Sequence, residues 1–78
     1  MIRMSVQTKM DNKVVIEKAT DFFAKKNGLK ATEQGDCCAS FEGAGGYVRV
    51  DVASNGKTEV TLESREHEYL VKKFAESL

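Results

Sequence analysis

Several residue types are scarce in this sequence, and each shortage narrows what the chain can be. Its 78 residues include no proline, one histidine and two cysteines, and no run of about 18 apolar residues. The single histidine excludes a His-His metal site, and the adjacent Cys37 and Cys38 lack the C-x-x-C spacing of redox or zinc motifs. We therefore expect no metal, no cofactor and no membrane partner.

The sequence also lacks an excess of charge of either sign. Twelve basic residues balance twelve acidic ones, which argues against a general polyanion binder and mildly favours self-association. Without proline, repeats or low-complexity tracts, residues 1–78 are expected to form a single domain. The N-terminal residues 1–7 lack the apolar region of a signal peptide, so we expect a cytoplasmic protein.

Alternating apolar and polar residues predict five strands. The pattern is clear over residues 2–10 and strongest over 47–52 and 59–63, whereas it is weaker over 29–33 and 37–42. A half-buried strand shows this period of two, because successive side chains point to opposite faces of a sheet.

Two amphipathic helices are also expected. Asp11 and Asn12 are N-cap candidates for a helix that ends at Lys26, before Asn27-Gly28. Its apolar stripe comprises Val15, Ile16, Ala19, Phe22 and Phe23. Ser64 is the expected N-cap of the second helix, whose stripe comprises Leu70, Val71, Phe74, Ala75 and Leu78.

The chain is therefore expected to be an α+β protein of order β-α-β-β-β-β-α. Its twisted sheet should be mostly antiparallel, with both helices on one face and the first strand as an edge candidate. The inner face should present Ile2, Met4, Val6, Phe41, Val48, Val50, Val52, Val60 and Leu62. This element order is similar to that of each repeat of the TATA-box-binding protein fold. The resemblance is one of topology alone, which does not carry function.

Glycine marks three of the strand connections, in residues 34–36, 43–46 and 54–57. The segment 43–46 (Gly-Ala-Gly-Gly) joins two expected strands, so we interpret it as a hairpin loop, because phosphate-binding loops lead from a strand into a helix. Asn55-Gly56 is expected to form a two-residue hairpin turn.

Three residues invite a chemical interpretation, and for each we favour a structural role. Strand phase directs Cys37 inward as a small hydrophobe and Cys38 toward the open face. His67 should lie in the first turn of the second helix, at the edge of the apolar stripe. An enzyme that uses Cys38 or His67 is the least favoured alternative, and no catalytic residue is assigned.

The open face offers the remaining candidates. Tyr47 and Arg49, with Gly43, Gly45 and Gly46, form a possible interaction surface, since tyrosine and arginine are enriched at interfaces. We expect Arg49 to pair with a carboxylate on a neighbouring strand. The favoured function is a non-enzymatic interaction module with a protein partner, most simply a second copy. A weak nucleic-acid-binding domain is the alternative, disfavoured because carboxylates share this face.

Overall fold

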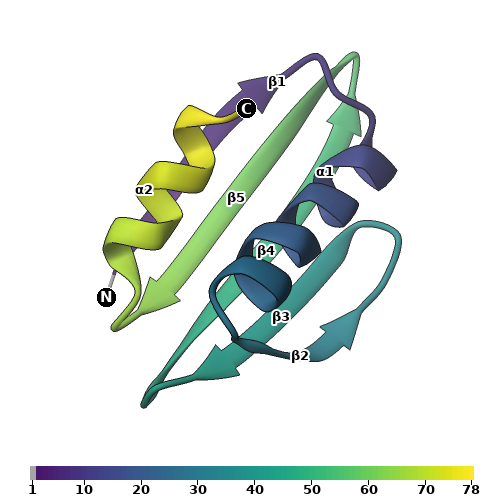
Figure 1. The fold of residues 1–78 in the computed structure, drawn as a ribbon. Coiled ribbons are helices and arrows are strands. Elements are labelled where there is room, and N and C mark those ends of the chain that lie inside the picture. Colours follow the sequence, from purple (N-terminus) through teal and green to yellow (C-terminus); the bar gives the residue numbers. More distant parts are fainter. Residues whose placement is uncertain (1) are drawn as a thin grey trace.

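Five antiparallel strands form one sheet, and the helices cover one of its faces (Figure 1). The computed structural model describes residues 2–78, and at position 55 the backbone only. The elements are β1 (Ile2–Thr8), α1 (Asn12–Ala19), η1 (Thr20–Lys26), β2 (Lys30–Gln34), β3 (Cys38–Gly43), β4 (Gly46–Asn55), β5 (Lys57–Arg65) and α2 (Glu68–Glu76). With α1 and η1 as one continuous helical segment, the expected order β-α-β-β-β-β-α is confirmed.

The spatial order of the strands is β1-β5-β4-β3-β2. Strands β2 to β5 follow one another as a meander, and β1 joins beside β5 through the pairs from Ile2↔Ser64 to Thr8↔Thr58. The expected position of the first strand at an edge is confirmed, and β2 forms the other edge.

Apolar side chains of the inner face meet the helices in one core. Phe41, Val48, Val50, Val60 and Leu62 are fully buried, and Val52 is nearly so. At the β1 edge, Ile2, Met4 and Val6 are only half-buried. The predicted inner face is therefore confirmed, with its least covered part along β1.

The first helical segment changes its geometry midway. Asp11 caps it as expected, because its Oδ1 accepts a hydrogen bond of 2.9 Å from the backbone N–H of Asn12. From Thr20 onward the segment is a π-helix, so the expectation of one regular helix to Lys26 is wrong in its second half. At the change, Thr20 Oγ1 donates to the Ile16 carbonyl oxygen at 2.9 Å, a side-chain contact that competes for the backbone acceptor.

The connection from β5 to α2 corrects a second expectation. Ser64 is not an N-cap: it is fully buried within β5, where its hydroxyl donates to the Tyr47 carbonyl oxygen at 2.9 Å. The chain then turns through Glu66, whose φ is +72°, and α2 begins at Glu68. Residues Leu70, Val71 and Phe74 are buried as predicted.

The β3–β4 connection is a hairpin as expected, whereas the β4–β5 connection differs from the expected two-residue turn. In the β3–β4 turn, Ala44 and Gly45 lie between the paired residues Gly43 and Gly46 and have φ of +51° and +80°, as a two-residue hairpin turn requires. The Asn55-Gly56 expectation is wrong, because Asn55 pairs with Lys57 and leaves Gly56 alone at the tip.

No helix among residues 2–78 combines the length and the apolar character needed to cross a membrane.

Candidate functional site

The glycine turn of the predicted interaction surface packs against the β5–α2 junction. A Cβ atom at Gly46 would lie 2.1 Å from the Arg65 carbonyl oxygen, whereas one at Gly45 would meet nothing within 4 Å. His67 Nε2 lies 2.7 Å from the Gly43 carbonyl oxygen. Gly43 and Gly46 therefore lie where the β3–β4 turn packs against the β5–α2 junction. Of the three glycines, only Gly45 faces open space.

Tyr47 and Arg49 lie on the open face, and both contact carboxylates. The Tyr47 hydroxyl donates to Glu63 Oε2 at 3.1 Å. Arg49 Nε donates to Asp51 Oδ2 at 3.1 Å. The expected partner on a neighbouring strand is thus corrected, because Asp51 lies two residues along the same strand. The Asp51 carboxylate also raises the pKa of Arg49 above its ordinary value.

We predict that Tyr47 ionises above the ordinary tyrosine value near 10. Desolvation and then the hydrogen bond to Glu63 raise its pKa. The folded state therefore holds this proton more tightly, and the associated stability is complete below pH 10 and lost as pH rises through the folded-state pKa. Titration of tyrosinate absorbance in Tyr69→Phe, which leaves Tyr47 as the only tyrosine, measures this pKa. In the added Glu63→Gln variant it should fall towards 10, and an unchanged value would contradict the assignment.

The adjacent cysteines leave the chain on different faces. The Cys37 Sγ lies 3.3 Å from Asn12 Nδ2 at the start of α1, on the helix side of the sheet as expected, but Cys37 is exposed in the turn before β3, so the expectation of a small hydrophobe in the core is wrong. The β3 ladder begins one residue later than the sequence pattern indicates, and Ala39 takes the first inward position. Cys38 lies half-buried on the open face as expected. The two thiols do not converge on a common site.

His67 is more deeply placed than the sequence pattern indicates. It is 7 % exposed and precedes the first turn of α2 rather than lying within it. Its contact with the Gly43 carbonyl oxygen ties the start of α2 to the β3–β4 turn. This geometry assigns the imidazole a structural task, because hydrogen bonding satisfies a buried polar group.

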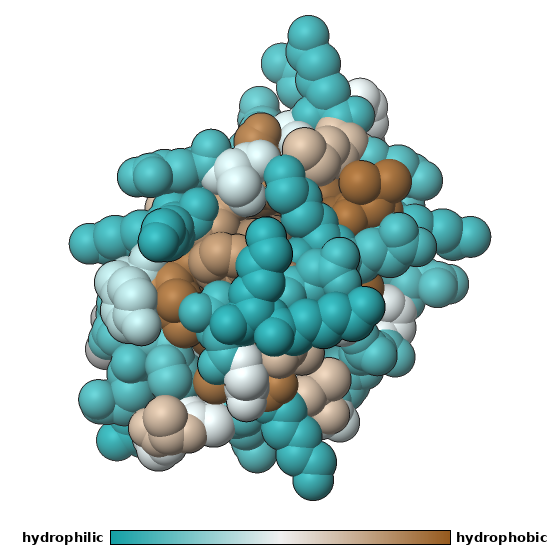
Figure 2. Space-filling model, in the orientation of Figure 1, coloured by the Kyte–Doolittle hydropathy of each residue, from teal (hydrophilic) through white to brown (hydrophobic). Residues whose placement is uncertain are grey.

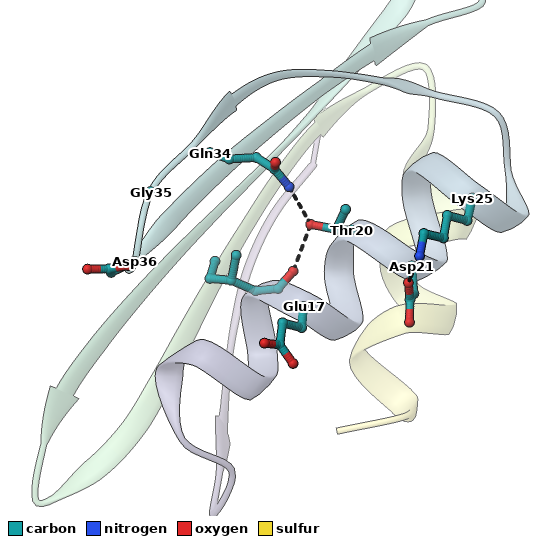
Figure 3. A pocket seen from close by; sticks show the side chains of 8 residues that line it. Glu17, Thr20, Asp21, Lys25, Gln34, Gly35 and Asp36 are labelled. Carbon is teal, nitrogen blue, oxygen red and sulfur yellow. Dashed lines mark hydrogen bonds and ion pairs between the residues drawn. The ribbon is translucent and has the colours of Figure 1, made fainter.

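A hollow of about 570 Å³ separates the first helical segment from the β2–β3 turn (Figure 3). Gln34 Nε2 donates to Thr20 Oγ1 at 2.7 Å and so ties the end of β2 to the helix. The lining carries the carboxylates of Glu17, Asp21 and Asp36, and Asp21 is paired with Lys25 at 3.2 Å. Among residues 2–78, no three His, Cys, Asp or Glu side chains are grouped as metal ligands.

The two edges of the sheet differ in their suitability for pairing. Strand β2 is short and its register shifts between Ala31 and Glu33, features that discourage the addition of another strand. Strand β1 has seven residues and an unbroken register with β5. Arg3 is its only charged residue. Of the two edges, β1 is therefore the better template for another strand.

Comparison with protein-family models, curated proteins and solved structures found no match to this chain.

The sequence pattern predicted β1 as an edge candidate, whereas the predicted interaction surface of Tyr47, Arg49 and the glycine turn lies on β4 and the β3–β4 turn. The alternation of residues 2–8 contained the needed signal: an apolar inner face combined with a nearly uncharged outer face. Edge strands that avoid pairing usually carry charges, proline or bulges. The sequence of β1 has few of these protective features. Their scarcity favours pairing only in a strand at an edge of the sheet, and the strand order places β1 there.

Proposed function

We propose that this chain is a non-enzymatic interaction module that self-associates by pairing β1 with β1 of a second copy. The observation that carries the proposal is the regular, nearly uncharged edge of β1, seven residues long and without a register shift. Such an edge offers unpaired backbone N–H and C=O groups to another strand.

A two-fold axis at Ser5 gives the most favourable antiparallel register. It places Arg3 opposite Gln7 of the second copy, so the two arginines do not face each other. On the inner face it places Met4 opposite Val6. Cross-strand pairs of this kind stabilise antiparallel ladders.

The same register covers apolar surface that one chain leaves incompletely buried. Ile2, Met4 and Val6 are half-buried at the sheet edge, and the partly buried Met4 and Val6 already pack on the core. Pairing extends the core across the axis and makes a continuous sheet from two copies. In such a two-fold dimer, both β1 edges are paired with each other. No β1 edge then remains free to bind a third copy.

Charge substitutions at Ser5 test this register. Ser5 lies opposite itself across the proposed axis, so Ser5→Lys places two cations face to face. We expect wild-type protein to have twice the mass of one chain in light scattering at tens of micromolar. Ser5→Lys and Ser5→Glu should each raise the dimer dissociation constant by roughly tenfold or more, because like charges meet at the interface.

Mixing the two variants supplies the decisive control. An equimolar mixture of Ser5→Lys and Ser5→Glu should form a heterodimer, since opposite charges then meet. Thr32→Lys, on the exposed β2 edge, should leave the mass unchanged. A monomeric wild type, or equal dimerisation by all variants, would reject pairing through β1.

A further inference from the structure

The two helices enclose a second hollow, on the side of the sheet opposite the open face. It has a volume of about 590 Å³, and its lining combines two aromatic residues with six polar or charged ones. Its residues are Lys18, Asp21, Phe22, Lys25, Lys26, Lys73, Phe74 and Ser77. Ligand sites often lie between helices and occupy roughly 300–1,000 Å³.

The half-buried Phe22 supplies the exposed aromatic surface of this hollow, and the fully buried Phe74 packs against it. Phe22 from η1 and Phe74 from α2 have ring centroids 5.7 Å apart, and Phe22 keeps part of its surface exposed. Viewed onto the helix layer, the surface shows apolar areas bordered by hydrophilic side chains (Figure 2). An alkyl chain that covers the exposed part of Phe22 removes apolar surface from water.

Positive charge surrounds the aromatic pair. Of the four lysines in the lining, Lys25 pairs with Asp21, the one acidic residue there. Lys18 Nζ donates to the Ser77 carbonyl oxygen at 2.7 Å, an uncharged acceptor that leaves the ammonium charge uncompensated. Within residues 2–78, no carboxylate lies within 4.0 Å of the Lys26 or Lys73 ammonium groups.

We propose that this hollow binds an amphipathic organic anion, an alkyl carboxylate that lays its chain over the exposed part of Phe22 and its head between Lys26 and Lys73. The three uncompensated cations favour an anion over a neutral lipid, and the apolar surface beside them favours an anion with an alkyl chain over a small inorganic one. The neighbouring hollow shares the Asp21–Lys25 pair but adds the carboxylates of Glu17 and Asp36, which disfavour the same ligand.

Titration with monomeric decanoate, followed by calorimetry and by backbone amide chemical shifts, tests the site. Shifts should concentrate in residues 18–26 and 73–77. Affinity should fall as salt is raised, because exposed charge pairs are screened. It should also fall by roughly two- to fourfold for each methylene removed from decanoate to octanoate, in keeping with burial of the chain.

Paired lysine variants isolate the head group contact. Lys26→Ala/Lys73→Ala should weaken decanoate binding by roughly five- to tenfold. Lys13→Ala/Lys72→Ala removes one exposed lysine from α1 and one from α2, outside this hollow, and should change affinity by less than about twofold.

Three outcomes would overturn the proposal. Decanol could bind as tightly as decanoate, or the two double variants could weaken binding equally. Binding to anionic phosphatidylglycerol vesicles without binding to monomeric decanoate would assign the helix layer to a membrane surface instead.

Discussion

Phe23→Ala should lower the free energy of unfolding by about 4 kcal/mol, the larger of the two strongest effects expected in this protein. Phe23 is fully buried and connects the sheet to both helical segments. Its ring centroid lies 5.4 Å from that of Phe41 and 5.2 Å from that of Phe74. The truncation leaves a cavity at this junction, and urea titration at one fixed protein concentration measures the loss.

Phe22→Ala provides the matched comparison, since it removes the same atoms from the adjacent, half-buried position. We expect a cost of about 1–2 kcal/mol there, because less apolar area returns to water. Equal costs at the two positions would show that Phe23 does not hold the core together as described.

Gly46→Ala should destabilise the protein by about 3 kcal/mol through steric overlap. Gly46 does not have positive φ, so alanine meets no backbone restriction there. The new methyl group would instead lie 2.1 Å from the Arg65 carbonyl oxygen and 2.6 Å from Glu66 Cβ. Because these neighbours are backbone and backbone-proximal atoms, β4 must separate from the β5–α2 junction. Thermal and urea unfolding both measure this effect.

Gly45→Ala is the control that distinguishes steric overlap from an unfavourable backbone conformation. Gly45 has φ of +80° and open space at the Cβ position, so alanine there should cost only about 1 kcal/mol. If Gly45→Ala were the more destabilising of the two, the close approach at Gly46 would not be the controlling feature.

Much of this fold followed from local patterns in the sequence. Alternation located the strong strands β4 and β5, and the stripe from Val15 to Phe23 located the first helix, because burial of one face imposes these periods. The errors arose where a distant contact decided the outcome. Serine is a common N-cap residue, yet Ser64 is buried in β5, where its hydroxyl donates to the Tyr47 carbonyl oxygen.

The candidate surfaces were less accessible to sequence reasoning. Residue type alone indicates Tyr47 and Arg49 as interface candidates, but their carboxylate partners depend on register and side-chain reach. The hollow with Lys26 and Lys73 lies between two helices that are separated in sequence by strands β2 to β5. No local sequence pattern therefore reveals it. The sequence predicted β1 as an edge candidate, but the comparison of its edge with that of β2 required the strand order, which hydrophobic periodicity does not specify.

The place of β1 in the sheet also has a consequence for the order of folding events. Strands β2 to β5 pair with their neighbours in sequence, whereas Ile2 must meet Ser64 and Thr8 must meet Thr58 across more than half of the chain. Closing so long a loop is entropically costly, so local hairpins form more readily than this pairing. A newly made chain therefore exposes the complementary edge of β5 until its own β1 arrives. During that interval, β1 of another molecule can occupy the same place, and domain swapping competes with the edge pairing proposed for the finished fold.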